Sequence, residues 1–125
     1  MSIGNITISE AELEIMKALW NSDTALNSIE IGEAVKAQEW KKTTIATFLT
    51  RLCEKGAIKA EKQGKLYYYT ALIPEDAYKK SRTDSLIKSL YHGSVKELAA
   101  ALFADERLSP EDIEQLRLIF DDKED

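Results

Sequence analysis

The stretch that decides the fold of this chain is KKTTIATFLTRLCEKGAIKAEKQGKLYYYTALI, residues 41–73. Five apolar residues in its first half recur at i, i+3, i+4, i+7 and i+8, the spacing that aligns side chains along one face of an α-helix. These residues are Ile45, Phe48, Leu49, Leu52 and Cys53. Gly56 follows as a natural helix C-cap, so the pattern predicts a helix over residues 43–55.

Beyond Gly56 the periodicity changes from helical to alternating. Ile58 and Ala60 alternate with polar residues, the pair Gln63-Gly64 is typical of a tight turn, and a tyrosine-rich segment follows. This pattern predicts a β-hairpin with strands at about 57–62 and 66–72, which together form a wing over residues 57–72.

Two helices are predicted before this stretch. Ser9 and Glu12 have the spacing of a capping box, and the apolar residues after them repeat at helical spacing, which predicts a helix over 9–20. A second helix start lies at Asn27, and its apolar pattern extends to about residue 37. Helix, helix, helix and hairpin in this order are typical of a winged helix-turn-helix.

A second helical module is predicted after Pro74. Apolar stripes precede and follow His92-Gly93, and Ser109-Pro110 supplies the N-cap and first-turn proline of a last helix. We therefore expect a mainly α fold with a small β-hairpin wing. Its two parts are a winged helix-turn-helix domain over residues 1–73 and a three-helix domain over residues 74–125.

The C-terminal module carries more apolar surface than its size can bury. Three short helices in about fifty residues can hardly cover three apolar stripes among themselves. Pairing with a second copy of the chain would cover them, so we expect a homodimer formed by this module. The residues expected at the dimer interface are Leu86, Leu90, Val95, Leu98, Leu102, Ile113, Leu116 and Phe120.

Charge is distributed unevenly along the 125 residues. The whole chain has 17 basic and 22 acidic residues, a net charge of −5 that alone argues against a nucleic-acid partner. Residues 36–65, however, contain eight basic and three acidic residues, a local net charge of +5. This basic block coincides with the predicted third helix and the wing, so it marks the surface that would face DNA.

The polar face of the predicted helix over 43–55 is rich in threonine. Short hydroxyl side chains allow a helix to enter the major groove, and an arginine or lysine can bind a phosphate or a guanine. Lysines at the helix N-terminus add to its affinity for phosphate. The residues expected to contact DNA are Lys41, Lys42, Thr43, Thr44, Thr47, Thr50 and Arg51, with Lys62 and Lys65 from the wing.

Two other interpretations of this face remain. Threonines and lysines on a helix exterior are often only solvated, and a winged helix can also serve as a docking surface for another protein. The second interpretation makes the chain a protein-interaction adaptor that does not bind DNA. Salt dependence would distinguish the two, because phosphate contacts weaken steeply as salt rises.

Several other classes of protein are disfavoured by composition. The single Cys53 and the single His92 exclude a disulfide scaffold, a zinc ribbon and an H-E-x-x-H metal site. The five glycines fit no phosphate-binding loop, and no nucleophile and base pattern is evident, so we expect neither an enzyme nor a cofactor. No leader or membrane-spanning segment is apparent, and we expect a cytoplasmic protein without membrane insertion.

Four segments of the chain together resemble the bacterial penicillinase-repressor (BlaI/MecI) family of winged helix-turn-helix transcriptional regulators. They are ISEAELEIMKALW (8–20), TTIATFLTRLCEKG (43–56), GKLYYYTALI (64–73) and GSVKELAAALFADERLSPEDIEQLR (93–117). The resemblance implies a homodimeric repressor whose C-terminal helices interlock and whose N-terminal domains bind a palindromic operator in double-stranded DNA. It also places Ala46 in the recognition helix.

The resemblance has implications for regulation as well. In the β-lactam-responsive members, a membrane sensor-protease pathway cleaves the repressor at an Asn-Phe bond in the dimerisation domain. The matching position in this chain is Ala101-Leu102, which is the candidate cleavage position although the residue pair differs. Copper-responsive members carry C-terminal Cys-x-Cys motifs, and Cys53 as the only cysteine excludes that branch.

Overall fold

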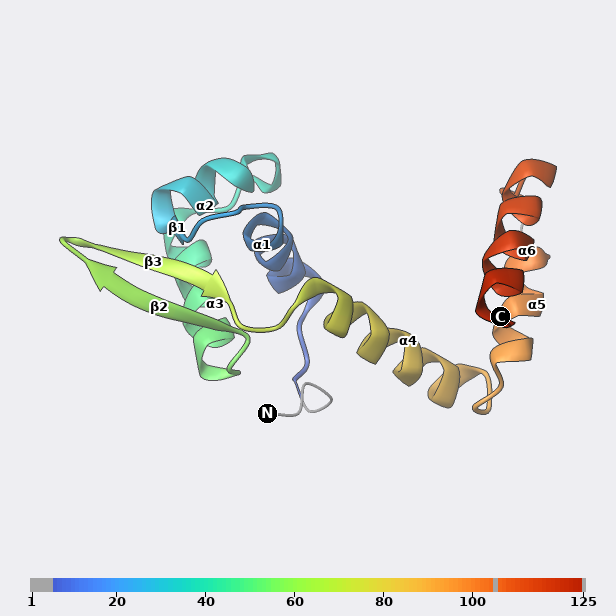
Figure 1. The fold of residues 1–125 in the computed structure, drawn as a ribbon. Helices are drawn as coiled ribbons and strands as arrows, with labels where there is room; N and C mark the ends of the chain where they lie inside the picture. The colour runs from blue at the N-terminus through green and yellow to red at the C-terminus, as the bar shows by residue number, and fades with distance from the viewer. Residues whose placement is uncertain (1–5, 105, 125) are drawn as a thin grey trace. The chain divides into compact units, whose positions relative to one another are not determined.

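The computed structural model describes residues 6–104 and 106–124, without the side chains of 120 and 122–124. The chain divides into two compact units, Met1–Ser81 and Arg82–Asp125. The first contains three complete α-helices, the start of a fourth and a small β-sheet, and the second is helical (Figure 1). A mainly helical fold with a small antiparallel sheet was predicted, and the structure confirms it.

The helices of the first unit begin where the sequence predicts. They are α1 (Glu10–Trp20), α2 (Ser28–Ala34) and α3 (Lys42–Glu54), with a short 3₁₀ helix, η2 (Lys36–Gln38), after α2. Reciprocal side-chain and backbone hydrogen bonds form capping boxes between Ser9 and Glu12 and between Asn27 and Glu30. The second predicted helix is therefore divided, since its last turn tightens into 3₁₀ geometry, a common way for a helix to end.

The sheet has three strands rather than the two predicted. The strands β1 (Leu26–Asn27), β2 (Ile58–Gln63) and β3 (Leu66–Ala71) are antiparallel in the order β1-β3-β2. The strands β2 and β3 form the predicted hairpin. No sequence pattern predicted β1, because two residues are too few to show alternation and Asn27 is also the N-cap of α2.

The core of the first unit joins its helices to the sheet. Its largest fully buried side chains are Ile15, Met16, Ile31, Leu49, Leu52, Ile58 and Ile73. Two tryptophans pack at its edges. The Trp20 indole Nε1 donates a 2.8 Å hydrogen bond to the carbonyl oxygen of Ile73, and the Trp40 ring meets Phe48 edge-on at 5.0 Å between centroids. Both tryptophans thus hold the ends of helices in place.

The division into compact units falls inside α4 (Glu75–Leu90). Tyr78, in the first turn of α4, is buried in the core of the first unit, with its ring centroid 5.8 Å from that of Trp20. The sequence predicts domains over residues 1–73 and 74–125, and nothing in the helical pattern after Pro74 indicates the contact of Tyr78 with Trp20.

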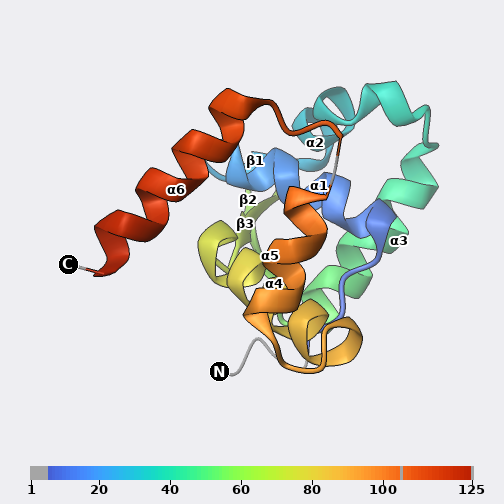
Figure 2. The same cartoon turned by 90° about the vertical axis from the view of Figure 1, so that its right-hand side faces the viewer.

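The second unit contains the rest of α4, followed by α5 (Val95–Phe103) and α6 (Pro110–Glu124). His92 and Gly93 have positive φ angles of 53° and 77°, which end α4, and the hydroxyl of Ser94 accepts a hydrogen bond from the Glu97 backbone to cap α5. Helices α5 and α6 run in different directions (Figure 2). Large apolar side chains of both helices remain exposed, among them Val95, Leu102, Leu118 and Ile119.

The turn between β2 and β3 depends on glycine. Gly64 has a φ angle of +67°, and a Cβ atom at this position would meet nothing within 4 Å. Replacing Gly64 with alanine should therefore lower the free energy of unfolding by about 1 kcal/mol through backbone strain alone. Urea denaturation measures this loss. Gly64→Asn is the matched control, because asparagine tolerates positive φ and should lower the free energy of unfolding by less. Equal stability of wild type and Gly64→Ala would contradict the prediction.

Candidate nucleic-acid interface

The N-terminus of α3 is open to solvent. Lys41 is its N-cap and makes no capping hydrogen bond through its side chain, and no acidic residue lies in the first turn. The first N–H groups of a helix have no partner within it, and they carry a partial positive charge. With the exposed Lys41 and Lys42 beside them, these groups form a surface suited to a phosphate.

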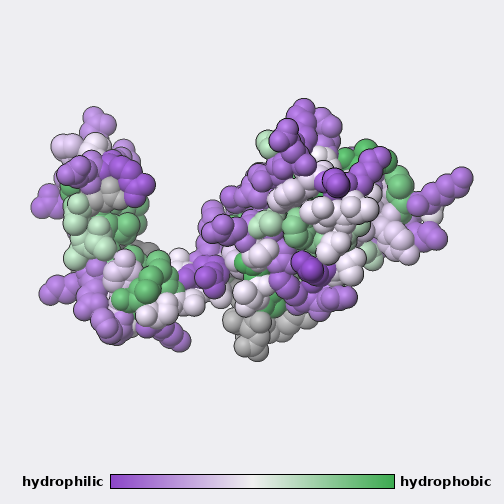
Figure 3. Space-filling view, turned by 180° about the vertical axis from the view of Figure 1, so that it is seen from behind, coloured by the Kyte–Doolittle hydropathy of each residue, from purple (hydrophilic) through white to green (hydrophobic). Residues whose placement is uncertain are grey.

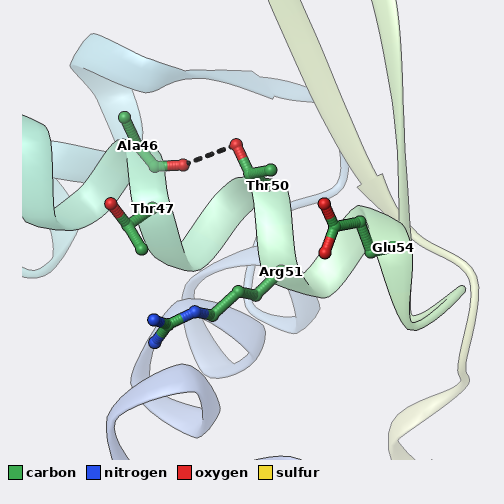
Figure 4. A pocket seen from close by; sticks show the side chains of 5 residues that line it. All are labelled: Ala46, Thr47, Thr50, Arg51 and Glu54. Atoms are coloured by element: carbon green, nitrogen blue, oxygen red, sulfur yellow. Dashed lines mark hydrogen bonds between the residues drawn. The ribbon is translucent and has the colours of Figure 1, made fainter.

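The exposed side of α3 is shallow and lined by small side chains. Ala46, Thr47, Thr50, Arg51 and Glu54 surround a slight hollow, and all five are exposed (Figure 4). Thr43 is exposed as well, whereas Thr44 is half-buried. The structure therefore places all the predicted residues of this helix on one accessible side, with Thr44 at its margin.

The basic residues of the block over 36–65 fall into two sets. Three of them form ion pairs: Lys36 with Glu33, Lys55 with Glu12 and Lys59 with Glu61. Within the described part of the chain, the others have no acidic partner. These are Lys41, Lys42, Arg51, Lys62 and Lys65, the five basic residues that the sequence assigns to DNA contact.

Lys55 is held by partners within the first unit rather than left available at the interface. Its ammonium Nζ donates to the Glu12 carboxylate at 2.5 Å and to the Thr7 carbonyl oxygen at 2.7 Å. Burial raises the pKa of the Glu12 carboxyl, but hydrogen bonds from Lys55 and Ser9 outweigh it, and the pKa lies below its ordinary value. This ion pair ties the start of α1 to the end of α3.

The wing presents two lysines near its tip. Lys62 lies at the end of β2, opposite Tyr67 on β3, and Lys65 lies in the turn beside Gly64. Both lysines are exposed. Long cationic side chains at the tip of a hairpin can reach phosphates beside the groove that a helix occupies.

Apolar side chains gather on the surface of the second unit (Figure 3). Of the residues predicted at the dimer interface, Leu90, Val95 and Leu102 are 65%, 59% and 49% exposed. Leu86 and Ile113 are also exposed, and Leu98 and Leu116 are half-buried. The side chain of Phe120 lies outside the described residues.

Two further apolar residues on α6 are exposed and were missed from the sequence. Leu118 and Ile119 are each 55% exposed. The prediction followed one stripe, Ile113, Leu116 and Phe120, at three- and four-residue spacing. The run LIF at 118–120 was the available signal, because adjacent apolar residues widen the apolar face beyond a single stripe.

The candidate cleavage position lies in the body of α5. Ala101 and Leu102 are both helical and exposed. A peptide bond within a helix becomes accessible to a protease when the segment opens locally, so cleavage at this position requires the unwinding of α5.

Other kinds of site lack support among the described residues. In that part of the chain, no three His, Cys, Asp or Glu residues are grouped so that they could hold a metal ion. Cys53 packs partly against the core, and burial, with the nearby Glu54 carboxylate, raises the pKa of its thiol. A raised thiol pKa disfavours the reactive thiolate. No helix of residues 6–104 and 106–124 has the length and apolarity needed to cross a membrane.

Comparison with known proteins identifies the family to which this chain belongs. The family model described as Penicillinase repressor matches residues 8–122. The chain belongs to this family. The penicillinase repressor of Bacillus licheniformis is 33% identical over 115 residues, covering 92% of this chain and 90% of that protein. The methicillin resistance regulatory protein MecI of Staphylococcus aureus (strain N315) is 34% identical over 116 residues, covering 93% and 94%.

Two solved structures of the repressor BlaI are similar to part of the chain. The DNA-binding domain of the repressor BlaI has a TM-score of 0.53 and 40% identity, covering 58% of this chain and 89% of that one. The Bacillus licheniformis BlaI monomer in complex with the blaP half-operator has a TM-score of 0.50 and 41% identity, covering 58% and 88%. The relatives named above are repressors or regulatory proteins rather than enzymes.

Proposed function

We propose that this chain is a transcriptional repressor that binds double-stranded operator DNA through α3 and the wing. The observation that carries the proposal is the pairing of charges in the basic block. Ion pairs hold three of its cations, while the five without an acidic partner in the described chain lie at the start of α3, on its exposed side and at the wing tip. BlaI, a family member, is the repressor seen with a half-operator.

Each part of this surface has a distinct role in the proposal. The open N-terminus of α3, with Lys41 and Lys42, binds a phosphate at the edge of the major groove. The exposed side of α3, with Thr47, Thr50 and Arg51, faces the base edges. Lys62 and Lys65 bind the backbone beside the groove, which fixes the register of α3 on the duplex.

We further propose that the protein acts as a homodimer on a palindromic operator. Residues 1–73 would form the DNA-binding domain and residues 74–125 the dimerisation domain. The large apolar side chains exposed on the second unit support this, because a second copy would remove them from water.

Two linked domains bind two half-sites far more tightly than one, so loss of the dimer releases the DNA. Cleavage at Ala101-Leu102 by a sensor-protease pathway in the cytoplasm is one route to that loss.

Removing the Arg51 guanidinium tests the DNA-binding face. Arg51 is exposed and lies on the side of α3 that would face DNA, so Arg51→Ala should weaken operator binding by about tenfold. The measurement is a fluorescence anisotropy titration with a labelled DNA fragment selected by the wild-type protein. Lys17→Ala is the matched control, because it removes one positive charge from α1, where Lys17 pairs with Glu14.

The salt dependence of the same titration distinguishes DNA binding from an adaptor role. Phosphate contacts release counterions, so wild-type affinity should fall steeply between low and physiological salt, and the Arg51→Ala slope should be shallower if Arg51 binds a phosphate. An affinity of folded Arg51→Ala equal to that of wild type would contradict the assigned face. No DNA binding at any salt concentration would favour the adaptor.

A further inference from the structure

A row of three side chains runs along the exposed side of α3. Thr47, Thr50 and Glu54 are at i, i+3 and i+7, the spacing that places residues above one another on a helix. All three are exposed and line the same shallow hollow. Arg51 lines the same hollow, but its side chain extends in a different direction from that of Thr50 (Figure 4).

The hydroxyl protons of this row are directed inward. Thr47 Oγ1 donates to the Thr43 carbonyl oxygen at 3.0 Å, and Thr50 Oγ1 donates to the Ala46 carbonyl oxygen at 3.0 Å. A hydroxyl has one proton to donate, so these oxygens offer only lone pairs to a partner outside the helix. The methyl groups of the two threonines remain available for apolar contact.

Glu54 extends the same chemical character by one turn. An ionised carboxylate has no proton to donate, and Glu54 forms no ion pair or hydrogen bond within the described part of the chain. The row therefore presents acceptors and methyl groups but no donor. Thr47 and Thr50 were expected at the DNA surface from the sequence, whereas Glu54 was not among the predicted contact residues.

We propose that this row determines which bases the protein accepts, and that Glu54 is a specificity-determining residue. The proposal rests on DNA binding by α3. In the major groove, adenine and cytosine present amino donors and thymine presents a methyl group, whereas guanine presents the acceptors O6 and N7. A surface of acceptors and methyl groups complements the first three bases on the contacted strand and repels guanine there.

The first test combines base substitutions in the DNA with the substitution Glu54→Gln in the protein. A bound DNA fragment is selected from a random library with wild-type protein, and each A or C of its half-site is changed to G, with the partner base changed to match. For at least one position on the contacted strand, wild-type affinity should fall about tenfold. For Glu54→Gln, whose amide can donate to guanine, the same change should cost less than about threefold.

Glu14→Gln is the matched control for that test. It removes the same charge from α1, so it should retain the full penalty for guanine. The proposal is wrong if wild type binds every guanine fragment as well as the selected one, if Glu54→Gln retains every penalty, or if Glu14→Gln relieves the penalty equally. Absence of any selected fragment would overturn DNA binding itself, so failures of the two proposals are distinguishable.

The second test removes the thymine methyl groups. The selected fragment is made with uracil in place of thymine, and wild-type affinity should fall about fourfold for each methyl group that is buried. Thr47→Val retains the methyl group and should retain this preference, while Thr47→Ser retains the hydroxyl and should lose part of it. Equal binding of both fragments by wild type, or an undiminished preference in Thr47→Ser, would overturn methyl contact by the row.

Discussion

Leu102→Asp is expected to lower operator affinity by about 10²–10⁴-fold without altering any residue of the DNA-binding surface. Leu102 lies on α5 and is 49% exposed in the single chain, so the substitution places a carboxylate on surface that the dimer would bury. Burying an unpaired charge in an apolar interface is strongly unfavourable. The protein would remain monomeric, and each half-site would then be bound separately.

Sedimentation velocity and titration of a full operator measure the two parts of this effect. Wild type should sediment as a dimer at micromolar concentration and Leu102→Asp as a monomer. Ala100→Asp is the matched control, because Ala100 is exposed on the opposite side of α5 and its substitution should preserve the dimer. A wild-type protein that is monomeric at this concentration, or a Leu102→Asp dimer, would rule out the proposed interface.

Lys55→Met is expected to lower the free energy of unfolding by about 2–3 kcal/mol at pH 7. The substitution retains the aliphatic stem but leaves the Glu12 carboxylate, whose side chain is 3% exposed, without its cation. Breaking a fully buried ion pair costs about 3–5 kcal/mol, and the cost is smaller here because Lys55 is 33% exposed. Without Lys55, the Glu12 carboxylate would keep the hydrogen bond from the Ser9 N–H to Oε1, while Oε2 has no hydrogen-bond partner, so its charge would be buried without a cation.

The effect of Lys55→Met should depend on pH in a definite direction. In wild type, the Glu12 pKa is lowered on folding, so the ionised form adds stability above about pH 4.5 that is lost as pH falls through the folded-state pKa. In Lys55→Met, burial should raise the pKa of the Glu12 carboxyl, and its protonation should remove the unfavourable buried charge. The difference in unfolding free energy between the two proteins, measured by urea denaturation, should therefore shrink towards pH 3.

Lys59→Met is the control for this pair. Lys59 and Glu61 are 50% and 60% exposed, and ion pairs in that setting contribute about 0–1 kcal/mol. Its effect should be small at every pH. A pH-independent loss in Lys55→Met would contradict the assignment of the effect to the charge pair of Lys55 and Glu12.

The elements with strong periodicity were predictable from the sequence, and those fixed by long-range contacts were not. The apolar stripe of α3 and the capping box of α1 are local patterns, and both helices form where these patterns indicate. The strand β1 has two residues and exists because β3 lies beside it. The unit boundary inside α4 depends on the packing of Tyr78 against Trp20, which no spacing rule reveals.

The candidate site shows the same division. The sequence located the basic block and the polar side of α3, because both follow from charge and helical period. The sequence predicts DNA contact for Lys62 and Lys65, and not for Lys55 and Lys59, but all four are lysines in one basic segment and their charge alone gives no reason for that division. Only the positions of Glu12 and Glu61 distinguish cations with an internal partner from cations available to DNA.

Both tryptophans of the chain, Trp20 and Trp40, lie in the first compact unit. Their indole emission therefore reports on that unit alone, whereas far-ultraviolet circular dichroism reports on the helices of both. Trp40 also adjoins Lys41, the N-cap of α3, so its fluorescence is placed to respond when a ligand reaches that helix end. The unlabelled protein thus carries its own optical probes for the unfolding of one unit and the occupation of one surface.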